Sequence, residues 1–331
     1  MPFRYVPLIR TKAGEATALH HLTAAAKQRM LPVFHLTTVV PTTFMPKLVA
    51  AWAGRPTAVD GTWNFGQTNT TTAFSALING LRSGGVLAFP CIEVGAAPGY
   101  LAAVSAAMVA APALGVAVKV RLGQISQLQT WIASAQLNPQ SIDLIISAGH
   151  VPDFGQGVLD PVISQHLASI PSLGWRSVTL AASAAPRDFS SLSLGVNVVP
   201  RLDWQLWQAV HHSAPGQLDY GDFGTGHPDL TDVPGIAMAS ATVSVKYTLD
   251  NSWLMIKGRP TTGQHAIPMS VQYRGHSQAL NASMGFGGLV GCWGDGRIQQ
   301  IATTAPNSGG RATWVEIAMN RHLSLVADRL P

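Results

Sequence analysis

The chain has 331 residues, of which 47% are hydrophobic and only 11% charged, with a formal net charge of +5. No run of five basic residues occurs, so the positive charge alone supports nucleic-acid binding weakly. Its two cysteines, Cys91 and Cys292, form neither a disulfide framework nor a metal-binding spacing. No segment reaches the ~18 uncharged apolar residues of a membrane-spanning helix. We therefore expect a cytoplasmic protein without membrane contact.

Short apolar runs alternate with segments of helical spacing through the first two thirds of the chain. The β-favouring runs lie at residues 4–10, 31–36, 58–63, 86–94, 115–122, 142–146 and 176–182. The segments with helical spacing follow them at residues 16–30, 44–52, 72–81, 99–111, 126–135, 160–168 and 202–211. This alternation is typical of a parallel sheet that is covered by helices on both faces.

An eighth apolar run begins the stretch LDYGDFGTGH and is predicted to be a strand over residues 218–222. Eight units favour a closed (β/α)8 barrel of the TIM type over an open, doubly wound sheet. The first strand is not followed by G-x-G-x-x-G, which also argues against a dinucleotide-binding fold. The predicted fold class is therefore α/β.

The periodicity changes after the eighth strand. Residues 241–247 and 252–257 flank Asp250 and Asn251, a pattern typical of a β-hairpin. A loop rich in Pro, Gly and His (258–278) and a glycine-rich stretch (285–296) follow, and helical spacing returns at 311–326. We predict a single domain over residues 1–331, with residues 233–310 as an elaboration over one mouth of the barrel and the last helix closing the eighth unit.

Several segments together resemble the phage-type beta protein family. They are YVPLIRTKAGEATAL at the start, the third strand ending in Asp60, IDLII, DYGDF, VKYTLDNSWLMIKGR and the closing TW..IAMNRHLSLV. The resemblance runs nearly end to end. It implies a barrel-like fold and genes carried by phages, prophages and bacterial defence islands, beside a toxic or nuclease-like partner that the beta protein restrains or assists.

The chain departs from the family pattern at three places. The family pattern resembles a second strand that carries a Glu and often an acidic residue after IDLII, and this chain has His35 and Ser147 at those places. Near the C-terminus, Arg321 and His322 replace what resembles a pair of histidines. These departures weaken any metal-dependent chemistry that the resemblance might imply. No cofactor is predicted, and the sequence leaves open whether a metal ion or a phosphate binds at the barrel mouth.

Strand ends of the predicted barrel should gather seven polar residues around one opening. These are His35, Asp60, Glu93, Arg121, His150, Asp219 and Asp222. The catalytic candidates among them are Asp60, Glu93, His150, Asp219 and Asp222, because carboxylates and histidine can divide acid and base work or bind a divalent metal. Each could equally be solvated or paired, as Arg121 with Glu93. Asp219 and Asp222 need not share a face unless Gly221 bends the strand.

A second group of candidates concerns binding. Basic residues after the hairpin could hold a phosphate, although Lys257 could equally be a solvated charge on a strand edge. Aromatic residues in the same region favour a partner surface, with core packing as the alternative. The binding candidates are Arg121, Tyr220, Lys257, Arg259, Arg274, His276, Trp293, Arg297, Arg321 and His322.

Three functional hypotheses follow. The first is a barrel protein that binds a cognate protein encoded nearby and acts in phage competition or antiviral defence. The alternative is a barrel hydrolase acting on a phosphate-containing substrate such as a nucleotide or nucleic acid. Direct binding of DNA or RNA is a third and weaker hypothesis, and the sequence leaves open whether the protein is an enzyme.

Overall fold

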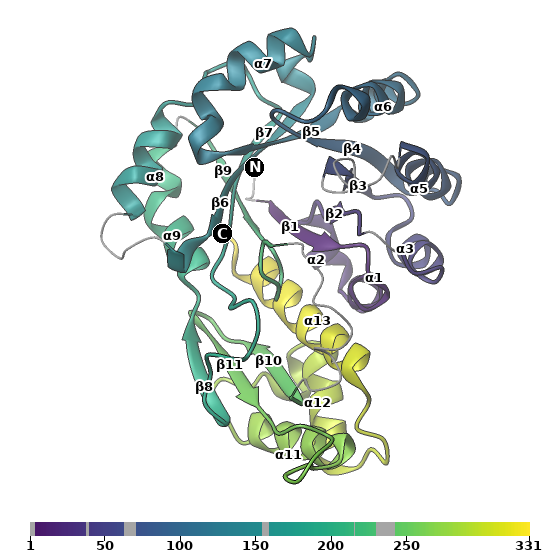
Figure 1. The fold of residues 1–331 in the computed structure, drawn as a ribbon, viewed down its shortest axis with the longest axis vertical. Helices are drawn as coiled ribbons and strands as arrows, with labels where there is room; N and C mark the ends of the chain where they lie inside the picture. The colour runs from purple at the N-terminus through teal and green to yellow at the C-terminus, as the bar shows by residue number, and fades with distance from the viewer. Residues whose placement is uncertain (1–3, 38–39, 63–70, 154–158, 215, 230–241) are drawn as a thin grey trace.

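The computed structural model describes residues 4–37, 40–62, 71–153, 159–214, 216–229 and 242–331. Eight parallel strands close into a barrel in the order β1-β2-β3-β4-β5-β6-β7-β9 (Figure 1). The (β/α)8 prediction is thus confirmed. The barrel strands are β1 (Tyr5–Arg10), β2 (Val33–His35), β3 (Pro56–Asp60), β4 (Leu87–Glu93), β5 (Val116–Arg121), β6 (Ile142–His150), β7 (Ser177–Ser183) and β9 (Leu218–Asp222).

Alternation of side chains along each strand separates the barrel's interior from its outer core. In β5, Val116, Val118 and Val120 pack outward among the residues beneath the helices, whereas Ala117 packs inward. Because strand side chains alternate with a period of two, Lys119 lies on the inward face with Ala117. The apolar runs therefore hold the barrel together, and the polar residues between them enter its interior.

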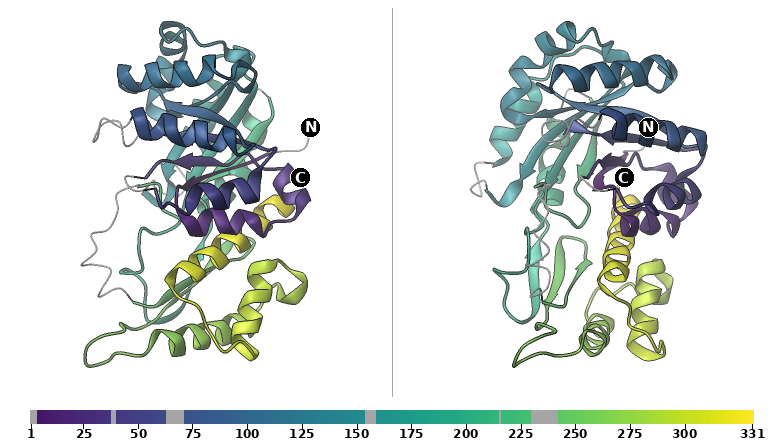
Figure 2. Two further views of the ribbon diagram at one scale, coloured as in Figure 1. Left: turned by 90° about the vertical axis from the view of Figure 1, so that its right-hand side faces the viewer. Right: turned by 45° about the vertical axis from the view of Figure 1, so that its right-hand side comes forward.

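Helices cover the outside of the barrel (Figure 2). The chain was expected to form one helix over residues 16–30, but it forms two, because the Thr23 side chain accepts a hydrogen bond from the Ala26 amide and caps a second helix. The helices preceding the eighth strand are α1 (Ala13–His20), α2 (Ala24–Gln28), α3 (Phe44–Trp52), α5 (Thr71–Ser83), α6 (Pro98–Val109), α7 (Leu128–Ser134), α8 (Leu159–Ala168) and α9 (Leu202–Val210).

A second, smaller layer lies below the barrel in the view of Figure 1. It is a three-stranded antiparallel sheet in the order β10-β11-β8, made of β8 (Gly195–Pro200), β10 (Ser244–Thr248) and β11 (Ser252–Lys257). The predicted hairpin is β10 and β11. Helices α11 (Met269–Asn281), α12 (Trp293–Thr303) and α13 (Arg311–Arg329) accompany the sheet. Helix α13 joins the two layers, since it packs against α1 and β1 as well as α12 and β10.

Three elements of the smaller layer were not predicted. Strand β8 was missed because Val196 and Val198 are exposed, so the strand is not a buried apolar run. The loop prediction for residues 258–278 was wrong from Met269 onward, where α11 buries polar Gln272 and Ser277 among its apolar contacts. The glycine-rich prediction likewise overlooked the start of α12.

The domain assignment, with residues 233–310 as an elaboration, stays a prediction, and residues 230–241 lie outside the described part of the chain. Within the described part, none of the helices combines the length and the apolar character that crossing a membrane requires.

Candidate functional site at the carboxyl end of the barrel

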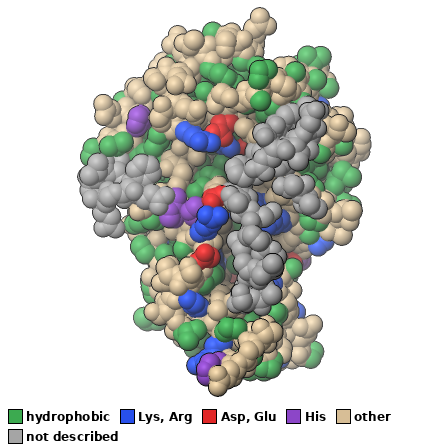
Figure 3. All heavy atoms as spheres, viewed as in Figure 1, with side chains coloured by type: hydrophobic (Ala, Val, Ile, Leu, Met, Phe, Trp, Pro, Cys, Tyr) green, Lys and Arg blue, Asp and Glu red, His purple; other side chains and the backbone are tan. Residues whose placement is uncertain are grey.

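A polar pocket of about 830 Å³ opens where the barrel strands end. Residues from the ends of β2, β4, β5 and β6 line it, together with residues that follow β9. In the space-filling view, basic and acidic side chains gather toward the middle of this face (Figure 3). The carboxyl end of the strands is where barrel proteins place their active sites. The pocket's size is in the range of sites that hold small ligands.

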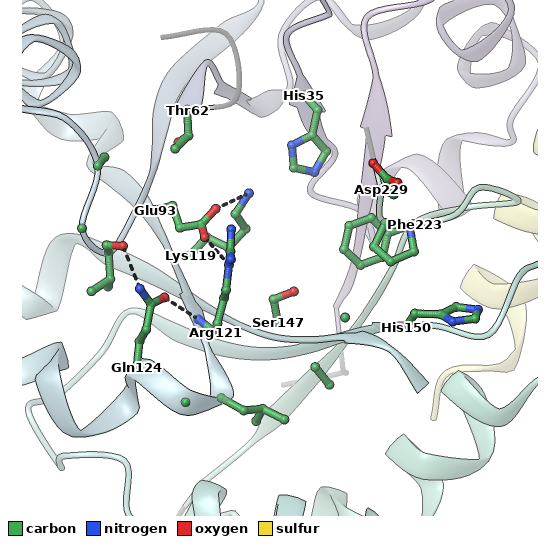
Figure 4. A pocket seen from close by; sticks show the side chains of 18 of the residues that line it. His35, Thr62, Glu93, Lys119, Arg121, Gln124, Ser147, His150, Phe223 and Asp229 are labelled. Carbon is green, nitrogen blue, oxygen red and sulfur yellow. Dashed lines mark hydrogen bonds and ion pairs between the residues drawn. The ribbon is translucent and has the colours of Figure 1, made fainter. Parts of the chain in front are cut away.

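A chain of ion pairs runs along one wall of the pocket (Figure 4). The Lys119 ammonium lies 2.6 Å from Oδ2 of Asp60 and 3.2 Å from Oε2 of Glu93. The other oxygen of Glu93, Oε1, lies 2.6 Å from Nε of Arg121. Lys119 and Arg121 are two residues apart on β5, so both project toward the pocket, and Glu93 on the neighbouring strand bridges them.

Burial and charge set the protonation states of the two innermost groups. Burial alone would raise the pKa of Asp60, but the Lys119 ammonium and the hydrogen bond from His35 outweigh it and hold this pKa well below its usual value. Burial alone would lower the pKa of Lys119, but Asp60 and Glu93 raise it above its usual value. Asp60 is therefore ionised and Lys119 protonated, which rules against Lys119 as an amine nucleophile in this arrangement.

His35 lies beside the ion pairs and contacts the same oxygen of Asp60 as Lys119 does. Its Nδ1 lies 3.1 Å from Oδ2 of Asp60, and its ring lies parallel to that of Phe223, with centroids 6.2 Å apart. Burial and the nearby Lys119 ammonium lower the pKa of His35 below its ordinary value, so the imidazole is neutral at pH 7. The buried Nε2 of His35 has no hydrogen-bond partner in the described part of the chain.

Further polar residues of the pocket come from β6 and from the segment after β9. Ser147 and His150 line the pocket from β6, and His227 and Asp229 line it from the segment that follows β9. The rings of His150 and His227 lie 4.4 Å apart. Within the described ranges, no cluster of three or more His, Cys, Asp or Glu side chains is placed to hold a metal ion.

The structure brings together only part of the predicted cluster. His35, Glu93, Arg121 and His150 line the pocket, and Asp60 lies directly behind its wall in contact with His35 and Lys119. Asp219 does not belong to this group, contrary to the expected gathering. It is the second residue of β9 and therefore lies at the amino end of the barrel, where Nε of Arg4 lies 3.2 Å from its Oδ2.

Asp222 and Tyr220 also face away from the pocket. They alternate with the inward Gly221, so both point outward beneath the helices. Asp222 Oδ2 lies 2.8 Å from Nε2 of His322 on α13, and its Oδ1 accepts a hydrogen bond from the Tyr5 hydroxyl at 2.6 Å. The expectation that Asp222 reaches the mouth is therefore wrong, because its side chain lies on the outward face of β9 and is held there by His322 and Tyr5.

The later binding candidates lie in the smaller layer, and most make local contacts. Lys257 donates to the carbonyl oxygens of Ser190 and Leu192. Arg321 pairs with the buried Asp295 at 2.9 Å. The remaining contacts are Arg274 to the carbonyl oxygens of Ile301 and Ala305, His276 to the carbonyl of Val243, Arg297 to Gln300, and Trp293 stacked on His21. They do not converge on the pocket, and Arg259 is exposed.

One central residue of the site, Lys119, was not among the candidates drawn from the sequence and was counted only as part of an apolar strand. His35 was expected at the mouth but was given no catalytic or binding role. A signal for Lys119 was present, since it is the charged residue in the inward register of GVAVKVRL. The signal for His35 required knowing that β2 ends beside Asp60, which the strand register supplies.

Eight parallel strands, an outer layer of helices and a polar pocket at the carboxyl strand ends define a (β/α)8 barrel protein. The chain belongs to the family described as Beta protein, whose family model matches residues 5–328. A comparison with curated proteins gives no match.

Proposed function

We propose that the barrel pocket binds and hydrolyses a phosphate-containing substrate. The observation that supports this most is the pair of cations on β5, Lys119 and Arg121, which Glu93 holds side by side on the pocket wall. Cations fixed in position before a substrate arrives stabilise charge on a transferring phosphoryl group without reorganisation during the reaction.

Both cations keep donors for an anion. Arg121 gives Nε to Glu93, and its side chain is 72% exposed, so its two terminal nitrogens face solvent in the described structure. A guanidinium with free terminal donors can bind phosphate oxygens in a bidentate manner. The Lys119 ammonium has three donors and contacts two described carboxylates, which leaves one N–H for a ligand.

The test uses the full chain with 4-nitrophenyl phosphate, bis(4-nitrophenyl) phosphate and ATP, with nitrophenolate and free phosphate as readouts. The wild type should hydrolyse at least one of them, and Arg121→Ala should lower kcat/KM about 10-fold to 100-fold, as expected for the loss of one charged contact. Arg259→Ala is the matched control, since Arg259 is exposed and distant from the pocket. Absence of hydrolysis by the wild type, or equal loss in both variants, would contradict the proposal.

As a second candidate function, we propose that the protein binds a cognate protein encoded nearby and acts in the cytoplasm in phage competition or antiviral defence. The family resemblance motivates this role, and β8 supplies a surface that suits it. β8 is an edge strand that pairs with β11 on one side, and Val196 and Val198 are 59% and 67% exposed. An uncharged, apolar edge of this kind favours addition of a strand from a partner.

Co-expression with the product of the adjacent gene tests this second function. A stable complex should form with the wild type, and Val196→Lys should weaken it, because a lysine on an edge strand opposes strand addition. Val109→Lys is the control, since Val109 is 82% exposed on helix α6 of the barrel layer. The second function fails if the adjacent product never associates with the wild type or if both variants bind alike.

A further inference from the structure

The ion pairs of the pocket leave one strong hydrogen-bonding atom unused. His35 is buried, lines the pocket, and its Nε2 has no partner in the described residues. A buried nitrogen without a hydrogen bond is destabilising, so such atoms usually meet a water molecule or a ligand. The position of this atom therefore marks where a bound group or a water molecule completes the site.

We propose that His35 is the general base of the pocket, taking a proton from the attacking water, and that Asp60 is the residue that positions it. This inference rests on the proposed hydrolysis of a phosphate-containing substrate. It assigns the proton acceptor, which the cations Lys119 and Arg121 cannot provide.

The hydrogen bond to Asp60 fixes which nitrogen of His35 carries the proton. An ionised carboxylate only accepts hydrogen bonds, so Nδ1 of His35 must be the donor to Oδ2 of Asp60. In the neutral ring, Nε2 then carries the lone pair; His35 lines the pocket, but this atom is itself closed to solvent in the structure. A group seated against Nε2 must itself be a donor, and a water molecule meets this requirement. The parallel ring of Phe223 limits rotation of the imidazole away from this orientation.

Charged groups on the neighbouring strands keep the base ready at neutral pH. Asp60 on β3 and Glu93 on β4 favour the protonated ring, whereas Lys119 on β5 and burial favour the neutral ring and prevail. On β1, Arg10 is next to His35 in register, and its guanidinium donates to the carbonyl oxygen of Asp229. A neutral His35 at pH 7 can accept a proton, as a general base must.

The water oxygen forms a bond to phosphorus as the bond from phosphorus to the leaving oxygen breaks, and the water proton passes to Nε2 of His35. The imidazolium then releases this proton to the leaving oxygen or to solvent, which restores the neutral ring. Lys119 and Arg121 stabilise the charge on the phosphoryl oxygens, and Asp60 stabilises the transient imidazolium through Nδ1.

Kinetics of His35→Asn and Asp60→Asn on the substrate that the wild type hydrolyses best test the roles. We expect kcat to fall about 10²-fold to 10⁴-fold in His35→Asn, the usual contribution of a general base. Wild-type kcat should decline as the pH falls through the lowered pKa of His35, and this limb should be absent from the residual activity of His35→Asn. Imidazole should partly restore activity to His35→Ala. His20→Asn, on the exposed face of α1, is the control.

The inference and the proposed function fail in different ways. If the wild type hydrolyses phosphate esters and Arg121→Ala is impaired but His35→Asn keeps the wild-type rate and pH profile, the base assignment is overturned and the function stands. Nitrogen NMR of the ¹⁵N-histidine-labelled protein gives a readout without substrate. It should show His35 protonated at Nδ1 alone at pH 7, and a proton on Nε2 would overturn the assignment.

Discussion

Charged side chains lie inside the barrel at both of its ends, but the two groups differ in how fully their hydrogen bonds and ion pairs are formed by the described residues. At the amino end, Asp143 accepts from Nη2 of Arg4 at 3.1 Å, from Nη2 of Arg176 at 2.6 Å and from the Ser177 hydroxyl at 2.6 Å. The neighbouring Asp219 is bonded to the amide and Nε of Arg4 and to Gln217. Both carboxylates are thus saturated by described residues.

At the carboxyl end, residues of the same kinds leave part of their hydrogen-bonding capacity unused within the described residues. Lys119 pairs with both Asp60 and Glu93, but the buried Nε2 of His35 has no partner in the described residues, and Arg121 on the pocket wall is 72% exposed. A cluster of charged side chains inside a barrel therefore does not by itself identify a functional site. Unused hydrogen-bonding capacity beside a cavity is the more discriminating feature.

The largest expected effect tests whether the amino end is structural. Asp143→Ala should lower the free energy of unfolding by about 3–5 kcal/mol, because it leaves Arg4 and Arg176 without their shared carboxylate. Urea denaturation at pH 7 measures this change. Asp143→Asn keeps the shape and some hydrogen bonds and should lose less. A stability of Asp143→Ala equal to that of the wild type would remove the structural interpretation of this end.

A smaller effect separates the two cations of the pocket. Lys119→Met should lower the free energy of unfolding by about 3 kcal/mol, since Asp60 and Glu93 would remain buried without it. Arg121→Ala should change stability by less than about 1 kcal/mol, because the exposed guanidinium is well screened by water. Thermal melts of the two variants under one buffer provide the comparison. Equal destabilisation would mean that Arg121 belongs to the structural core of the site.

The smallest expected effect is a difference in pH dependence. The pKa of His35 is lowered in the folded state, so its contribution to stability is complete above the unfolded pKa of about 6.5 and is lost as the pH falls below it. The pKa of Asp143 is also lowered, where burial is outweighed by Arg176 and Arg4, so its contribution is lost only below about pH 4.

Denaturation curves between pH 3 and pH 8 should therefore separate the two ends. From pH 6.5 to 5, the loss of stability should be smaller in His35→Asn than in the wild type, and below pH 4 it should be smaller in Asp143→Asn. Parallel curves for wild type and His35→Asn across the upper window would show that His35 is not held neutral by its surroundings.

Most of the barrel was predictable from the sequence, because its strands are short apolar runs that stand out in the hydrophobic pattern of the chain. Residues 218–222 were predicted as the eighth strand and are strand β9 in the structure. The smaller layer was harder, because β8 turns two valines to solvent and α11 buries polar side chains, so in neither element does the sequence pattern match the burial.

The site was predictable only where a residue's position along its strand was plain. Asp60 and Glu93 end their strands and reach the carboxyl mouth as expected. Asp219 was misplaced because three residues, or about 10 Å of strand, separate it from the end of β9. The pairing of His35 with Asp60 depends on the register between β2 and β3, which no local pattern encodes.

Helix α13 has a consequence for the order in which the chain acquires its structure. The side-chain amide of Asn320 donates to the carbonyl oxygen of Ala18, 302 positions earlier, and β1 pairs with β9 across the closure of the barrel. During synthesis, β1 and α1 must therefore wait for nearly the whole chain before their partners leave the ribosome. Such distant contacts predict slow folding through an early intermediate in which a strand edge is exposed.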